Sequence, residues 1–103
     1  MIDRINKNEE RLDRCLNAIK DLENSITNFN KVLKDVKDLN KYYGSKSWLS
    51  DMDKYDKKEI IDIKAGVLSE DGIWNMNESI ITLAEEMVEL SNKMLDNNIF
   101  NQE

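Results

Sequence analysis

The sequence predicts an all-α fold, a long antiparallel helical hairpin of the coiled-coil type with two short helices at its connecting end. Three observations favour this class. Apolar residues recur at alternating steps of three and four, the 103 residues include no proline and three glycines, and 35% of them are charged. Sheet proteins need turn residues at short intervals, whereas this composition is typical of helices packed lengthwise. A chain of this length is expected to form one domain.

The first expected element is a helix over residues 2–43. Two apolar columns run along it, each repeating every seven residues and the second offset from the first by three. They are Ile5, Leu12, Ile19, Ile26 and Leu33, then Cys15, Leu22, Phe29, Val36 and Tyr43, with Asn8 and Asn40 at column positions near the ends. These are the a and d positions of a heptad repeat, which predicts lengthwise packing on another helix.

Residues 44–68 are expected to hold the two short helices. Gly44 directly follows the long helix and is suited to a left-handed C-cap, after which Ser45 can cap a helix over residues 46–54. Asp56 with Glu59 resembles a capping box, which predicts a second short helix that ends at Gly66.

The last expected helix covers residues 69–97. Ser69 is a good N-cap, and Leu68 and Ile73 occupy the positions of a hydrophobic staple. Three neighbouring apolar columns make its apolar face wider than one helix partner requires, so this helix is expected to contact two surfaces. Residues 98–103 are expected to be a frayed tail.

The net charge of −6 is concentrated in this last helix. Residues 1–40 carry eight basic and eight acidic residues, residues 41–68 six and five, and residues 69–103 one and eight. The acidic residues that share one helix face are Asp71, Glu78, Glu85, Glu89 and Asp96. Three interpretations remain open: a solvated face, neutralisation by lysines of the first helix or of residues 44–68, or recognition of a basic partner.

Several chemistries are not expected. The chain has no histidine and one cysteine, which exclude an internal disulfide and multi-cysteine zinc sites. Residues 51–62 have EF-hand spacing, but Asp56 stands where glycine is needed. No cofactor, metal or nucleic-acid site is therefore predicted. Without a secretory signal or a bilayer-length apolar run, we expect a cytoplasmic location and no membrane contact.

Two short motifs resemble a known family. They are Tyr42-Tyr43-Gly44-Ser45-x-x-Trp48-Leu49-x-Asp51 and Gly66-Val67-Leu68-Ser69-Glu70-Asp71. Together they resemble a bacterial all-helical family known as domain of unknown function 4298, whose length and layout are similar to those of this chain. Gly72 departs from the pattern, since a helix former is expected there. The resemblance implies the helical fold and no established activity.

The motif residues can also be interpreted physically. The apolar ones are expected to be core: Tyr42, Tyr43, Trp48, Val67, Leu68 and Trp74. Asp51 has no structural explanation in the sequence, which makes it the strongest single candidate for a polar contact.

We therefore predict a non-catalytic protein–protein interaction module, most concretely a small acidic inhibitor or immunity-type protein that binds a basic protein. The predicted partner-binding residues are Asp51, Glu70, Asp71, Glu78, Glu85 and Glu89. A homodimeric helical scaffold or adaptor is the first alternative. The second is an enzyme with a carboxylate pocket lined by Asp51, Glu70 and Tyr55.

Overall fold

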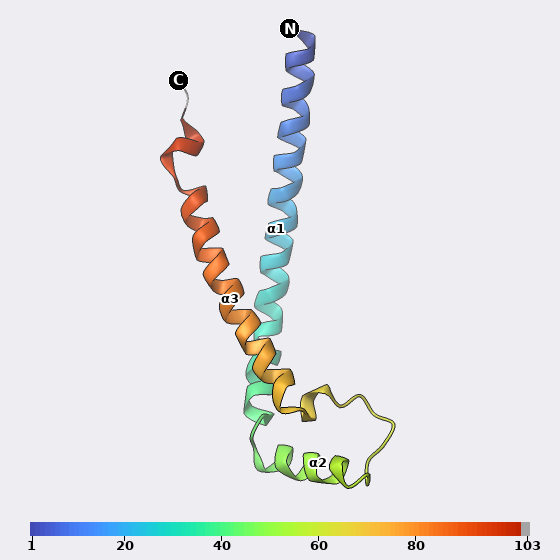
Figure 1. Cartoon of the computed structure of the whole chain (residues 1–103). Coiled ribbons are helices and arrows are strands. Elements are labelled where there is room, and N and C mark those ends of the chain that lie inside the picture. The colour runs from blue at the N-terminus through green and yellow to red at the C-terminus, as the bar shows by residue number, and fades with distance from the viewer. Residues whose placement is uncertain (102–103) are drawn as a thin grey trace. The chain divides into compact units, whose positions relative to one another are not determined.

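The computed structural model describes residues 1–101, and within that range it is all-α, as predicted. Three α-helices are present, α1 (Ile2–Tyr42), α2 (Lys46–Asp56) and α3 (Glu70–Met94), with 3₁₀ turns η1 (Gly66–Leu68) and η2 (Asn97–Phe100) (Figure 1). The chain divides into two compact units, residues 1–38 and the chain from Leu39 onward.

The first unit is a single helix, the part of α1 up to Asp38. No residue of α1 is buried. The heptad columns predict a helix correctly, because alternating steps of three and four place apolar side chains on one face. Within this unit, however, that face is open to solvent: Ile5, Leu12 and Ile19 are each about half exposed.

The second unit begins with the last turn of α1, which ends as predicted. Gly44 has a φ of +78°, the left-handed conformation that glycine adopts without steric cost. Ser45 then caps α2, since its hydroxyl oxygen accepts a hydrogen bond from the Trp48 backbone N–H at 3.1 Å. Only three residues, Tyr43, Gly44 and Ser45, therefore separate α1 from α2.

A small core holds the second unit together. Its three buried apolar residues are Trp48, Leu68 and Ile73. The Trp48 indole N–H donates to the Val67 carbonyl oxygen at 2.9 Å, and the Tyr43 ring meets the indole edge to face at 5.1 Å. Trp48 therefore joins α2 both to η1 and to the residue that follows α1.

Within the second unit, the end of α1 and the start of α3 run antiparallel. The Tyr43 hydroxyl donates to the Glu70 carbonyl oxygen at 3.0 Å, and Asn40 exchanges two amide hydrogen bonds with Asn77, at 2.8 and 3.0 Å. Three residues before Tyr43 in the chain, Asn40 contacts a residue of α3 that lies seven residues after Glu70, so the two segments run in opposite directions. This is the hairpin direction that the sequence predicts.

The predicted helix that begins at Asp56 is wrong. Asp56 is instead the last residue of α2, and residues 57–65 form turns and bends. Lys58 and Asp62 have φ values of about +60°, which a right-handed helix cannot contain. Only the 3₁₀ turn Gly66–Leu68 forms before α3, so the second short helix is later and shorter than predicted.

The start of α3 matches the predicted caps. The Ser69 hydroxyl accepts from the Gly72 backbone N–H at 2.9 Å and donates to the Gly66 carbonyl oxygen at 3.0 Å. Leu68 and Ile73, the predicted staple, are both buried. This arrangement also explains Gly72: a Cβ there would collide with the Gly66 carbonyl oxygen, so the tight η1–α3 junction requires glycine.

Two predicted core residues are exposed. Val67 contributes its carbonyl oxygen to Trp48 while its side chain is 40% exposed, and the Trp74 side chain is 58% exposed. Trp74 follows buried Ile73 directly, so it projects about 100° around the helix from the core-facing direction. The core is therefore smaller than the six motif residues suggest.

The C-terminal end differs slightly from the prediction. Helix α3 ends at Met94, three residues before the predicted boundary at 97. Residues 97–100, partly assigned to a frayed tail, form the 3₁₀ turn η2, whose first turn is capped by the Asp96 carboxylate accepting from the Asn98 N–H at 2.9 Å. The rest of that predicted tail includes residues 102–103, which lie outside the described residues.

Candidate functional site

Asp51 has a structural role that the sequence does not reveal. Its Oδ2 accepts a 2.6 Å hydrogen bond from the Tyr42 hydroxyl, which ties α2 to the last residue of α1. This hydrogen bond, together with desolvation and the negative charge of Asp51, raises the pKa of the Tyr42 phenol. Holding the junction between two helices is sufficient to explain a carboxylate at this position.

Glu70 and Asp71 lie in the first turn of α3 and are exposed. Their carboxylates lie at the positive end of the helix dipole, which accounts for acidic residues here. The Glu70 contact with Tyr43 uses the backbone carbonyl oxygen and leaves the carboxylate outside that hydrogen bond. The helix dipole thus gives these two predicted site residues a structural explanation as well.

The remaining predicted residues, Glu78, Glu85 and Glu89, lie farther along α3 and are all exposed. Among residues 39–101, Glu89 forms an ion pair with Lys93 at 3.7 Å, whereas Glu78 and Glu85 form none. The Glu89–Lys93 pair is exposed on both sides, and such pairs contribute little to stability. Lysines of the same unit therefore neutralise one of the three carboxylates, Glu89, and leave Glu78 and Glu85 without an ion pair in that unit.

An exposed apolar column runs beside these carboxylates. Its members follow one another at intervals of seven and are 53–74% exposed: Trp74, Ile81, Val88 and Leu95. Glu78 follows Trp74 by four residues and Glu85 follows Ile81 by four, so each pair lies on adjacent turns of one helix face. We call the apolar column together with Glu78, Glu85 and Glu89 the α3 stripe.

The sequence pattern contained a signal for this surface, since the apolar arc of α3 is too wide for one partner. The prediction that α3 contacts two surfaces did not say which column would stay open. The structure buries Ile73 and half-buries Met76 and Ile80 at the start of α3. It leaves the whole Trp74 column exposed, and beyond Ile80 the members of the other two columns are 43–49% exposed: Leu83, Met87, Leu90 and Met94.

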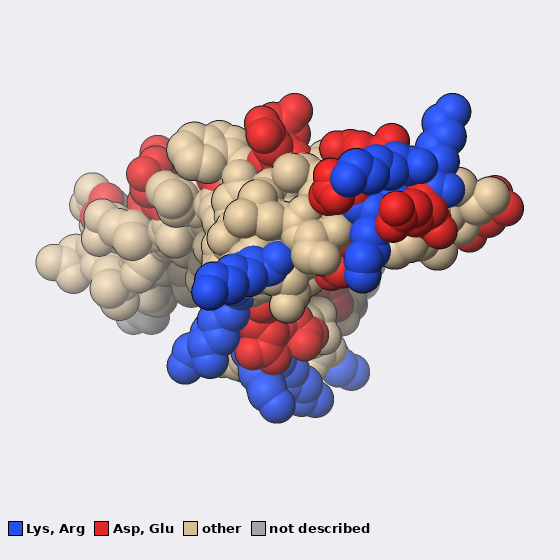
Figure 2. Space-filling model, turned by 90° about the horizontal axis from the view of Figure 1, so that it is seen from below, with Lys and Arg blue, Asp and Glu red and all other residues tan. Residues whose placement is uncertain are grey.

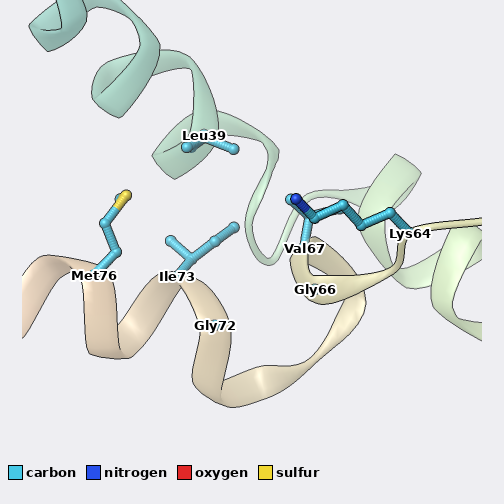
Figure 3. A pocket seen from close by; sticks show the side chains of 7 residues that line it. All are labelled: Leu39, Lys64, Gly66, Val67, Gly72, Ile73 and Met76. Carbon is cyan, nitrogen blue, oxygen red and sulfur yellow. The ribbon is translucent and has the colours of Figure 1, made fainter.

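A shallow apolar hollow lies on the other side of Ile73. It has a volume of about 470 Å³, and in Figure 3 the side chains of Ile73 and Met76 point toward Leu39 across it, with Lys64 and Val67 at one end. Its only charged lining residue among those described is Lys64. The hollow therefore offers apolar contact but no set of acid and base groups for catalysis.

A second hollow, of about 380 Å³, lies along the end of α2 and the loop after it, and it includes Tyr55, Asp56 and Lys58. Neither hollow is lined by Asp51 or Glu70, the other residues of the enzyme alternative. Among the described residues there is also no group of three or more acidic or cysteine side chains that could hold a metal ion.

The charges around α2 are mixed. On the face shown in Figure 2, basic side chains lie among acidic ones. Lys57 pairs with Asp53 at 3.0 Å within this region. A nucleic-acid surface needs basic side chains clustered on one face, which this face does not provide.

The chain belongs to the family described as Domain of unknown function (DUF4298), whose model matches residues 5–90. This agrees with the resemblance carried by the Tyr42–Asp51 and Gly66–Asp71 motifs. No curated protein and no solved structure matches the chain. In the part of the chain that the structure describes, none of the helices has the length and apolar character needed to span a bilayer.

Proposed function

We propose that this protein is a non-catalytic interaction module that binds a basic protein through the α3 stripe, in the manner of a small acidic inhibitor or immunity-type protein. The observation that supports this most is the pairing of exposed apolar side chains with unpaired carboxylates on adjacent turns of α3. A face that was only solvated would not need Trp74, Ile81 and Val88 beside the charges.

The stripe has the chemistry that fits a basic amphipathic helix. The apolar column supplies area to bury, while Glu78 and Glu85 supply negative potential beside it. Complementary charge accelerates encounter and selects the partner, and desolvated aromatic and aliphatic residues contribute most of the affinity. We propose that Trp74 and Ile81 contribute most of the affinity by burying apolar surface against the partner, and that the carboxylates select a basic partner.

The test is affinity capture from the native host, with mass spectrometry of the retained proteins. A triple variant, Glu78→Lys, Glu85→Lys and Glu89→Lys, raises the net charge from −6 to 0. The matched control, Asp13→Lys, Asp21→Lys and Asp35→Lys, makes the same change in charge on α1.

We expect a basic protein to be retained by the wild type and by the control but lost from the α3 variant. Its binding should also weaken steeply as the salt concentration rises, because exposed charges are screened. Equal retention by all three proteins would contradict the proposal, and so would a retained partner without a basic surface. An Ile81→Ser variant should lower the affinity without changing the salt dependence.

A further inference from the structure

The first half of α1 carries an apolar face that is open within the unit formed by residues 1–38. Ile5, Leu12, Leu16 and Ile19 are each 51–54% exposed, and α1 contains no buried residue. A single helix in water gains little from such a face, because isolated helices depend on packing for most of their stability. The face therefore requires a partner surface.

Helix α3 is too short to be that partner over the whole length of α1. Helix α1 has 41 residues and α3 has 25. At a rise of 1.5 Å per residue the two are about 62 and 38 Å long. At least four turns of α1 would therefore remain uncovered by α3 under any lengthwise pairing. Only a surface other than α3 could cover those turns.

The charged residues at heptad positions e and g, on either side of the a and d positions, indicate what kind of helix could cover this face. Between residues 4 and 23, the charged residues at position g of the heptad are Arg4 and Arg11, and those at position e are Glu9 and Glu23. In a parallel, in-register pair of helices, position g faces the position e five residues later in the other helix. Arg4 therefore meets Glu9, while Arg11 meets Leu16 and Glu23 meets Ala18. An antiparallel pair would set g against g and e against e, which places like charges together.

We propose that residues 4–23 of α1 form a parallel, in-register, two-helix coiled coil with a second copy of this chain. Arg4 then lies near Glu9 of the second copy, twice in the symmetric pair. The a and d layers are Ile5, Asn8, Leu12, Cys15, Ile19 and Leu22. Each residue in these layers meets its own counterpart, as two-fold symmetry requires.

Asn8 is compatible with this arrangement. In the single chain its side-chain amide donates to the Arg4 carbonyl oxygen at 3.0 Å, and its Oδ1 accepts from Arg11 at 2.9 Å. Its amide nitrogen and oxygen are thus both hydrogen-bonded within the helix, so Asn8 can occupy a d layer without leaving either atom unpaired. The dimer would present two copies of the α3 stripe.

The test is sedimentation equilibrium of the full chain from 1 to 200 µM. We expect a concentration-dependent dimer that Leu12→Asp converts to a monomer, since this change places two carboxylates in one layer. The matched control Asn17→Asp, on the opposite helix face, should leave the dimer intact. Fluorescence of Trp48 and Trp74, which both lie in the second unit, checks that each variant keeps that unit folded. A monomer at every concentration, or a dimer insensitive to Leu12→Asp, would overturn the proposal.

Orientation is tested with two further measurements. Arg4→Glu should weaken the dimer about tenfold, and adding Glu9→Arg should restore it; an antiparallel dimer would instead be strengthened by Arg4→Glu. Mild oxidation should link the two copies through Cys15 faster in the wild type than in Leu12→Asp, with Cys15→Ser as the blank. Strengthening by Arg4→Glu, or crosslinking at equal rates, would overturn the parallel arrangement.

Discussion

The two units of this chain use similar heptad-like patterns but are stabilised differently. Residues 1–38 form one helix without a buried residue, so its apolar columns remain open within the unit. The unit that begins at Leu39 buries Trp48, Leu68 and Ile73, and adds specific polar contacts at every helix junction. An apolar repeat thus predicts a helix in both units. The apolar face of that helix is partly covered only in the second unit, where turns in the chain bring other segments against it.

The largest expected effect comes from removing the centre of the second unit. Trp48→Ala should destabilise that unit by about 3–5 kcal/mol, because it deletes a buried aromatic ring and leaves a cavity. Urea unfolding followed by circular dichroism and Trp74 fluorescence measures the loss. The matched change Trp74→Ala, at a side chain 58% exposed, should cost less than about 1 kcal/mol. A similar loss of unfolding free energy in both variants would contradict the assignment of Trp48 to the core and of Trp74 to the exposed α3 stripe.

The next effect concerns the η1–α3 junction. Gly72→Ala should cost about 1–3 kcal/mol, because the added methyl group collides with the Gly66 carbonyl oxygen, which is backbone and cannot move aside freely. Gly66→Ala is the control, since a Cβ there meets no atom within 4 Å. Thermal unfolding of both variants measures the difference. If Gly72→Ala were as stable as Gly66→Ala, the junction would be looser than described.

A pH-dependent effect is expected at the junction between α1 and α2. The hydrogen bond to Asp51 raises the pKa of Tyr42, so the neutral phenol stabilises the fold below pH 10, and this contribution is lost as the pH rises through the folded-state pKa. Absorbance titration at 295 nm should show one tyrosine that ionises above the ordinary tyrosine pKa of 10, and Tyr42→Phe should remove it. Wild type should be more stable than Tyr42→Phe at pH 8, with the difference shrinking above pH 10. A difference that grew above pH 10 would contradict this assignment.

A smaller effect is expected where the end of α1 meets α3. A double-mutant cycle with Asn40→Ala and Asn77→Ala should give a coupling energy of about 0.5–1 kcal/mol, because the two amides exchange a pair of hydrogen bonds that water can partly replace. Urea midpoints at constant slope measure the coupling. A coupling of zero would show that the two amides contribute independently.

The smallest expected effect is that of a change in the first unit on the stability of the second, and it tests whether the two units unfold independently. Leu12→Ala should change the stability of the second unit by less than about 0.5 kcal/mol, because Leu12 is half exposed and lies in the first unit. Both tryptophans, Trp48 and Trp74, lie in the second unit, so their fluorescence during unfolding at 1 µM measures this directly. A large shift would show that the two units unfold together.

The candidate site was partly predictable. The carboxylates Glu78, Glu85 and Glu89 could be placed on one helix face because the period of 3.6 residues follows from helix geometry alone. The role of Asp51 could not, because its partner Tyr42 is nine residues away on another helix. The exposure of Trp74 was missed for a similar reason: the pattern marks an apolar arc on α3 but not which part of it is covered.

The sequence by itself determined the elements that depend on neighbours along the chain: α1, the left-handed Gly44, and the Ser45 and Ser69 caps. These involve residues at most four apart, so the local pattern contains the whole cause. Only the tertiary structure decided that residues 57–65 turn instead of forming a helix, that Trp48 reaches the Val67 carbonyl oxygen, and that Gly72 must lack a side chain. Those features depend on where a second segment lies in space, which no local period encodes.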